Sequence, residues 1–100
     1  HGDVVVLEFT AEWCLNCKLL EGTVLHDPSV AEALAADGVT PIKIDLTGNN
    51  VFGNALLNDV GGLRIPLLIV MDSNGNEVFR GDFYTIAQVL QAINQAKGKE

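Results

Sequence analysis

Hydrophobic residues follow two different periods along this chain. Two short runs, Val4–Thr10 and Leu67–Met71, are apolar nearly throughout, which predicts strands buried on both faces of a sheet. Residues 39–46 instead alternate apolar and polar side chains, so a strand with one less buried side is predicted there. The turn signal at 72–76 predicts that Glu77–Arg80 returns antiparallel as a hairpin.

A first helix is predicted to start at the two cysteines of the chain and to be short or kinked. Leu19 and Leu20 are its expected core residues. The pair Gly22-Thr23 follows them, and both residue types have poor helix propensity, which is the reason for the expected interruption.

Three further helices are predicted from caps and periodicity. Asp27-Pro28 has the pattern of an N-cap followed by proline at the first helical position, in a helix that ends near Asp37-Gly38. Residues 51–60 form a second helix, stopped by Gly61-Gly62, and Thr85 caps a third. The expected apolar positions of the three helices are Val30, Ala33 and Leu34; Phe52, Ala55, Leu56 and Val60; and Ile86, Val89, Leu90 and Ile93.

The order of these elements predicts the fold class. The order strand, helix, strand, helix, strand, strand, helix is typical of an α/β sandwich in which helices flank a mixed central sheet. With 100 residues and 48% hydrophobic content, the chain can build one core and is too short for two. We therefore expect a single domain over residues 1–100, present as a monomer.

Charge and hydropathy narrow the classes of partner. The formal net charge is −7 and no lysine or arginine cluster offsets it, so no nucleic acid partner is expected. No run approaches the roughly 20 apolar residues of a membrane span. The domain itself is therefore expected to be soluble. The opening residues His1-Gly2 fit either a domain excised from a longer parent or a tag remnant.

Both cysteines of the chain lie in the segment Trp13–Lys18, where an apolar strand meets a helix. Two thiols three positions apart at a helix start can form a disulfide or stand as a dithiol, which makes the site capable of two redox states. Cys14 would lie at the helix N-terminus, where free N–H groups and the macrodipole stabilise a thiolate. A thiolate attacks disulfides, so the Cys14–Cys17 pair indicates redox activity.

Three other interpretations of the pair remain open. A closed zinc site needs four ligands, and the only further nitrogen or sulfur ligands are His26 and His1. A structural disulfide over so short a loop would constrain the unfolded chain little. The third interpretation is an inert pair of thiols. The strand–CxxC–helix context favours redox chemistry over all three.

Two glutamates near the cysteines each allow two interpretations. Glu8 interrupts the apolar strand, and it either points outward to water or forms a buried acid behind the cysteines. Glu21 lies four residues after Cys17 on the same helical face and can point back toward the site. From the residues alone, a solvated Glu21 is the preferred interpretation.

A family resemblance rests on several of these segments. Residues 4–18 and Ile65-Pro66 resemble the active-site signature and the cis-proline loop of the thioredoxin superfamily. Within it, the chain resembles the C-terminal periplasmic domains of the transmembrane thiol:disulfide interchange proteins of the DsbD family. Those domains carry an acid six positions before the first cysteine, a glutamate seven after it and an Asp-Pro helix start; here Glu8, Glu21 and Asp27-Pro28 stand at those places.

The sequence also departs from the usual patterns. Leu15-Asn16 stands between the cysteines where thioredoxins usually have Gly-Pro, the first acid is glutamate rather than the commoner aspartate, and Leu67 follows the proline where threonine is usual. These departures bear on redox potential and on partner choice more than on the fold.

The resemblance implies roles for individual residues. It implies a three-layer thioredoxin-like sandwich and a cis bond at Pro66, which lies beside the cysteines and leaves the backbone groups of Ile65 free to pair with an extended substrate. Glu8 would relay protons to or from Cys17, Glu21 would face the site, and Trp13 would form an apolar docking rim.

The same resemblance implies a function. Cys14 would attack a partner disulfide and Cys17 would resolve the mixed disulfide, with no organic cofactor or metal. The partners would be protein disulfides and dithiols: a membrane-embedded domain that supplies electrons and a periplasmic domain that receives them. The chain would be a periplasmic domain of an inner-membrane protein. The alternatives are a free-standing thioredoxin-like reductase, including a cytoplasmic one, and a non-enzymatic thioredoxin-fold binding module or redox sensor.

Overall fold

The computed structural model describes residues 3–48, 50–62 and 64–98. The elements in chain order are β1 (Val4–Thr10), α1 (Leu15–Leu20), the π-helical segment η1 (Glu21–Leu25), α2 (Pro28–Leu34), β2 (Val39–Asp45), α3 (Val51–Asp59), β3 (Leu67–Met71), β4 (Glu77–Gly81) and α4 (Ile86–Ala96). The expectation for His1-Gly2 lies outside the described residues, and the polar end at 97–100 lies partly outside them.

The four strands form one mixed sheet in the order β2-β1-β3-β4. β1 pairs in parallel with β2 and antiparallel with β3, and β3 pairs antiparallel with β4 as the predicted hairpin. The two nearly continuous apolar runs of the sequence are therefore the two central strands, β1 and β3. The alternating segment at 39–45 is the edge strand β2, where only one face is well covered.

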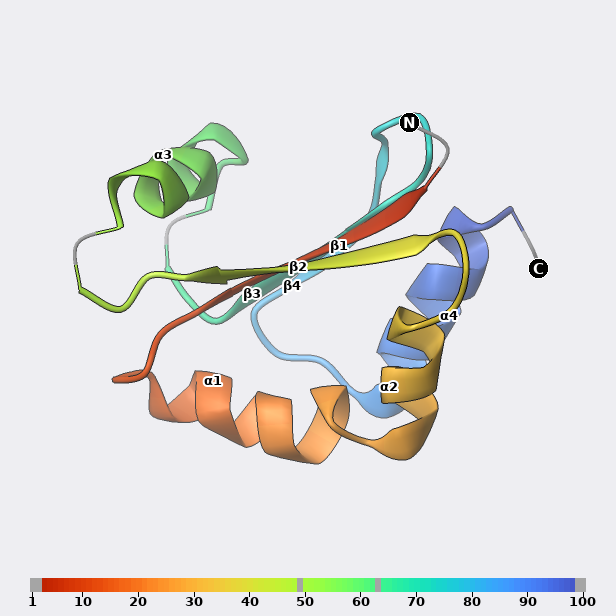
Figure 1. Cartoon of the computed structure of the whole chain (residues 1–100), viewed down its shortest axis with the longest axis horizontal. Helices are drawn as coiled ribbons and strands as arrows, with labels where there is room; N and C mark the ends of the chain where they lie inside the picture. The colour runs from red at the N-terminus through yellow and green to blue at the C-terminus, as the bar shows by residue number, and fades with distance from the viewer. Residues whose placement is uncertain (1–2, 49, 63, 99–100) are drawn as a thin grey trace.

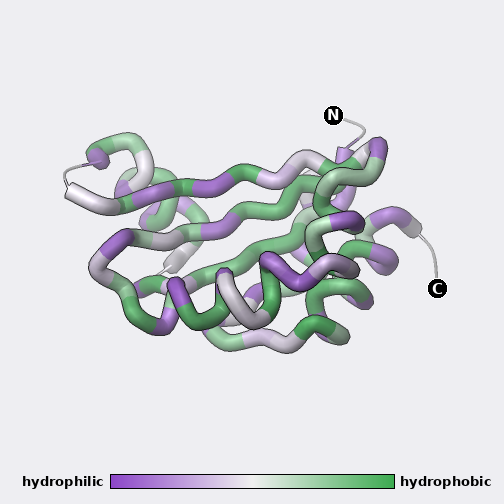
Figure 2. The backbone as a smooth tube through the Cα atoms, turned by 60° about the horizontal axis from the view of Figure 1, so that its bottom comes forward, coloured by the Kyte–Doolittle hydropathy of each residue, from purple (hydrophilic) through white to green (hydrophobic). Residues whose placement is uncertain are grey.

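Helices cover both faces of the sheet, which gives the predicted three layers. In Figure 1, α1, α2 and α4 lie on one side of the strands and α3 lies on the other. Side chains such as Val30, Val89 and Ile93 fill the core on the first side. Phe9, Ile44 and Leu57 belong to the core on the second side. Figure 2 shows hydrophobic positions concentrated along the central strands, and hydrophilic ones on the turns, the helices and the edge strand.

The predicted interruption of the first helix is confirmed. The α-helix ends at Leu20 and continues as the wider π-helical turn of η1, which contains Gly22-Thr23. Thr23 Oγ1 donates a hydrogen bond of 2.8 Å to the Leu19 carbonyl. Leu20 is buried, but Leu19 is 53% exposed, so the expectation that both are core residues was wrong. Consecutive helical residues are about 100° apart around the axis, so one of the two faces solvent.

The N-caps of α2 and α4 are the residues predicted from the sequence. Asp27 accepts a hydrogen bond from the Ser29 amide, with Pro28 as the first residue of α2. Thr85 and Gln88 form a reciprocal capping box at the start of α4. Helix α2 ends at Leu34, three residues before the predicted end at Asp37, because a turn leads into β2 from there.

The buried face of α3 differs from the prediction. Phe52 is 88% exposed and Ala55 is also exposed, although periodicity placed both on the apolar face. Gly53 is buried instead, and a Cβ at that position would lie 2.8 Å from the Leu46 side chain. Gly53 thus packs closely against the side chains of Asn50 and Leu46, whereas its neighbour Phe52 faces outward. A hydrophobicity pattern cannot identify a glycine as the contact residue.

Candidate functional site

The two cysteines form a disulfide at the start of α1, shortly after the end of β1. Cys14 is the N-cap of α1, and its Sγ accepts a hydrogen bond of 3.1 Å from the Cys17 amide. The two Cα atoms are 5.2 Å apart, within the normal range for a disulfide. Cys14 is 7% exposed and Cys17 only 2% exposed. The more exposed of the two cysteines therefore also lies at the helix N-terminus.

Apolar side chains and the proline loop surround this disulfide. Trp13 is 66% exposed and Leu15 is 85% exposed, although both are large hydrophobic residues. The Ile65–Pro66 peptide bond is cis. The next residue, Leu67, pairs with Phe9 of β1, which places the proline loop at the end of the sheet where β1 leads to the cysteines. The structure thus places Ile65-Pro66, distant in sequence, at the same end of the sheet as Trp13 and Cys14.

Glu21 is buried against β1 rather than solvated. It is 6% exposed, and its Oε2 accepts a hydrogen bond of 2.8 Å from Thr10 Oγ1. Lys18 Nζ lies 3.8 Å from Glu21 Oε1, and Lys43 Nζ lies 3.9 Å from Glu21 Oε2. The preference for a solvated Glu21 was wrong, because Glu21 opens the η1 turn that directs it toward β1.

Glu8 lies on the same face of β1 as Thr10, since alternate residues of a strand share a face. Burial raises the pKa of Glu8 to about 8, and the hydrogen bond and negative charge of Glu21 act in the same direction. Burial acts against ionisation of Glu21 too, but hydrogen bonds with Glu8 and Thr10 and the charges of Lys43 and Lys18 outweigh it and lower that pKa. At neutral pH the pair therefore holds one proton, on Glu8.

Sequence reasoning missed four residues of this acid cluster. Thr10, Lys18 and Lys43 all contact Glu21, and Tyr84 is a buried neighbour. Burial raises the pKa of Tyr84, followed by the negative charges of Glu8 and Glu21. The threonine at the end of an apolar strand was the one available signal, because a buried hydroxyl requires a partner.

Thr10→Val is expected to destabilise the fold by about 1–3 kcal/mol, because it removes the hydroxyl and leaves a buried carboxylate without that donor. The control is Thr40→Val, since Thr40 Oγ1 donates to Asp3 Oδ2 at an exposed site. The control should cost less than about 0.5 kcal/mol. Urea unfolding measures both. Equal losses would contradict the role of Thr10 as a partner of Glu21.

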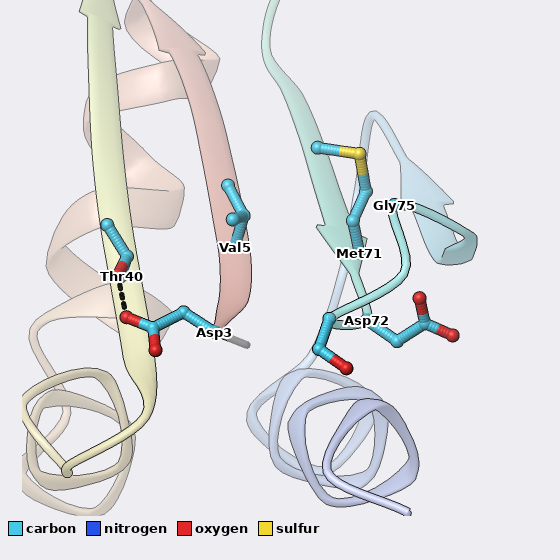
Figure 3. A pocket seen from close by; sticks show the side chains of 7 residues that line it. Asp3, Val5, Thr40, Met71, Asp72 and Gly75 are labelled. Atoms are coloured by element: carbon cyan, nitrogen blue, oxygen red, sulfur yellow. Dashed lines mark hydrogen bonds between the residues drawn. The ribbon is translucent and has the colours of Figure 1, made fainter. Parts of the chain in front are cut away.

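A separate hollow of about 460 Å³ lies at the other end of the sheet. Figure 3 shows it beside the start of β1 and the end of β3, with Thr40 bonded to Asp3 on one side and Asp72 on the other. Asp72 caps its own turn by accepting from the Asn74 and Asn76 amides. Within residues 3–48, 50–62 and 64–98, no group of three or more His, Cys, Asp or Glu residues is placed to hold a metal ion.

The fold and its Cys14–Cys17 disulfide define a thioredoxin-like thiol–disulfide oxidoreductase domain. The family model described as Thioredoxin-like matches residues 1–73, and the chain belongs to this family. It is similar to the C-terminal domain of DsbD from Neisseria meningitidis in the reduced form, with 30% identity and a TM-score of 0.75 over 96% of this chain and 84% of that one. A DsbH oxidoreductase, 18% identical with a TM-score of 0.78, shares the fold over 99% of this chain and 75% of that one.

Two curated relatives of this chain are also thiol:disulfide interchange proteins. The chain is 33% identical over 98 residues to the thiol:disulfide interchange protein DsbD of Haemophilus ducreyi, which is 95% of this chain and 17% of that protein. It is 36% identical over 80 residues to DsbD of Cronobacter sakazakii, covering 80% of this chain and 14% of that protein. The chain thus spans less than a fifth of the length of either relative. In the part of the chain that the structure describes, no helix has the length and apolar character needed to cross a bilayer.

Proposed function

We propose that this domain reduces protein disulfides by dithiol–disulfide exchange through Cys14 and Cys17. The observation that carries the proposal is the disulfide at the start of α1, together with the interacting acids Glu21, which is buried, and Glu8, which is half-buried. Glu8 and Glu21 stand at the positions where the DsbD-like pattern has acids. The likeness to the DsbD C-terminal domain over 84% of its chain supports the same conclusion.

The reaction transfers two electrons to the partner. The Cys14 thiolate attacks a partner disulfide, so that a Cys14–partner bond forms and the first partner sulfur leaves with the electron pair. Cys17 then attacks Cys14, the Cys14–Cys17 bond forms, and the second partner sulfur leaves. Glu8 accepts the proton that Cys17 gives up, and the partner thiolates take protons from water. The reverse direction uses the same residues.

The partner is positioned by the surroundings of the disulfide. Trp13 and Leu15 are exposed apolar side chains on either side of Cys14, and burying them against a partner is favourable. An extended segment of the partner pairs with the backbone of Ile65 ahead of Pro66, as an added strand does. These contacts select protein disulfides over small-molecule disulfides.

The wider context is part of the proposal. The domain functions as the C-terminal part of a DsbD-like transmembrane reductase, on the periplasmic side of the inner membrane. It takes electrons from a membrane-embedded domain and delivers them to a periplasmic domain.

Reduction of insulin by dithiothreitol tests the activity. The wild-type domain should accelerate precipitation of the insulin B chain several-fold over dithiothreitol alone. A rate equal to that of dithiothreitol alone would favour the non-enzymatic binding module or redox sensor. A free-standing reductase would pass this test, and the reading frame around the chain then separates it from a DsbD-like parent.

The two acids are expected to oppose ionisation of Cys14. An anion close by in a poorly solvated site disfavours a second negative charge. Glu21→Gln, which removes the anion of the pair, should therefore allow the Cys14 thiolate to form at lower pH, read from thiolate absorbance near 240 nm. Glu8→Gln should do so in the alkaline range, where Glu8 itself is ionised. The titrations are coupled, so the change belongs to the cluster. If both variants titrate like the wild type, the acids are only structural.

A further inference from the structure

A narrow cleft reaches Glu8 from the edge of the sheet. It encloses about 240 Å³, and its lining includes Glu8, Leu25, Leu34, Pro41, Lys43 and Leu68. Since a water molecule occupies about 30 Å³ in the liquid, the cleft has space for several. The walls are mostly apolar, and the carboxyl group of Glu8 and the ammonium of Lys43 are the charged groups that border it.

The cleft follows from the register of the sheet. Lys43, Glu8 and Leu68 lie side by side on β2, β1 and β3, on the face that α1 and α2 cover. Leu25 at the end of η1 and Leu34 at the end of α2 form the opposite wall. β2 is the edge strand, and both Pro41 and Lys43 are exposed there. The helices therefore leave the outer end of this row open.

This opening is separate from the surface that a partner covers. The lining of the cleft includes neither cysteine, nor Trp13, nor Ile65 or Pro66. The disulfide follows the end of β1, whereas the cleft opens beside β2. A protein docked over Cys14 and the proline loop would leave the cleft in contact with water.

We propose that the cleft beside β2 is the route by which Glu8 exchanges its proton with water while a protein partner covers the cysteines. This inference rests on the proposed function, in which Glu8 accepts the proton of Cys17. Glu8 can accept that proton only after it has lost its own. For each disulfide reduced, one proton leaves Glu8 through the cleft, Glu8 then takes the proton of Cys17, and two electrons pass to the partner.

Burial first, and then the charged groups around Glu8, set the pH at which this step is needed. The groups that act on the pKa of Glu8 are Glu21 at the start of η1, Lys43 of β2 and Lys18 of α1. Tyr84, in the loop before α4, lies within reach of the charges of Glu8 and Glu21. The pKa of about 8 means that Glu8 is mostly protonated at pH 7 and mostly ionised at pH 9. The proton route therefore matters at pH 7 and loses its effect at pH 9.

Blocking the cleft with Pro41→Trp tests the role. Residue 41 is opposite Val6 on the same face as Glu8, and an aromatic residue suits an exposed edge-strand position. At pH 7, reduction of insulin by the reduced variant should slow at least about fivefold, as loss of assisted proton transfer predicts. Hydroxyethyl disulfide is too small to cover the surface around Cys14 and the proline loop, so its reduction should change less than about twofold. At pH 9 the rates with both substrates should match those of the wild type.

Thr40→Trp is the matched control, because it adds the same ring one residue away on the other face of β2. Leu34→Trp blocks the cleft from the opposite wall and replaces Pro41→Trp if that variant does not fold. Equal slowing of both substrates, slowing that persists at pH 9, or slowing by Thr40→Trp would overturn the proposal. If the wild-type domain reduces neither substrate, the proposed function fails instead.

A labelling experiment tests the access route without relying on activity. In a Cys14→Ser, Cys17→Ser background, methyl methanethiosulfonate should modify Glu8→Cys at least about tenfold faster than Val70→Cys, whose site is buried outside the cleft. Adding Pro41→Trp should slow the Glu8→Cys reaction to near the Val70→Cys rate. Labelling that Pro41→Trp leaves unchanged would show that water reaches Glu8 by another path.

Discussion

Cys14→Ser is expected to abolish disulfide reduction, and Cys17→Ser is expected to stop the reaction at a mixed disulfide with the partner. Cys14 is the more exposed sulfur and the N-cap of α1, so it is the group that a partner disulfide can reach. Cys17 is nearly fully buried and can attack only a bond already formed to Cys14. Turnover of insulin should fall about 10³-fold or more in both variants, because each removes a reacting atom.

The two variants differ in what accumulates. Non-reducing electrophoresis and mass spectrometry should detect a covalent adduct of the Cys17→Ser domain with a disulfide-containing protein, and none with Cys14→Ser. In the reduced wild type, limiting iodoacetamide should modify Cys14 well before Cys17. Gln91→Ala, which changes an exposed residue of α4 away from the cysteines, is the control and should keep its activity within a few-fold. Adducts formed through Cys17 would reverse the assignment.

Glu8→Gln is expected to stabilise the fold at alkaline pH and to leave its stability unchanged near pH 5. In the folded protein the pKa of Glu8 is raised from 4.5 to about 8, chiefly by burial. The folded state thus binds more protons than the unfolded chain between these values, and wild-type stability falls as pH rises through that window. Glutamine is never ionised and can still donate a hydrogen bond to Glu21.

The expected gain at pH 9 is on the order of 2 kcal/mol, since one pKa unit corresponds to about 1.4 kcal/mol and coupling to Glu21 reduces the full effect. Urea unfolding at pH 5, 7 and 9 measures it, and the difference should grow at each step. Glu32→Gln, on the exposed side of α2, is the control and should differ from the wild type by less than about 0.5 kcal/mol. A difference independent of pH would contradict a buried neutral Glu8.

The strands, the caps and the cysteine pair could be predicted from the sequence because their causes are local. The bounds predicted for β1 and β3 agree with the structure, since central strands require continuous apolar residues. Asp27-Pro28 and Thr85 begin their helices, because a cap depends only on the following turn. The disulfide joins residues three apart in sequence.

Contacts between distant segments were decided only by the tertiary structure. Phe52 is exposed and Gly53 is packed against the side chains of Asn50 and Leu46, a contact that no periodicity records. The burial of Glu21 depends on the η1 turn, which directs its carboxyl to Thr10.

The difference between the two acids also comes from packing. Glu8 and Glu21 are the same residue type, and the sequence by itself could place a carboxyl group near the cysteines at either position. Lys18 and Lys43 lie beside Glu21, and Thr10 donates to it, so that Glu21 is the anion and Glu8 the neutral acid. The proton stays on Glu8, because there the cost of burying a charge exceeds the stabilisation by nearby cations and hydrogen-bond donors. This difference arises only when β1, β2 and α1 are packed together.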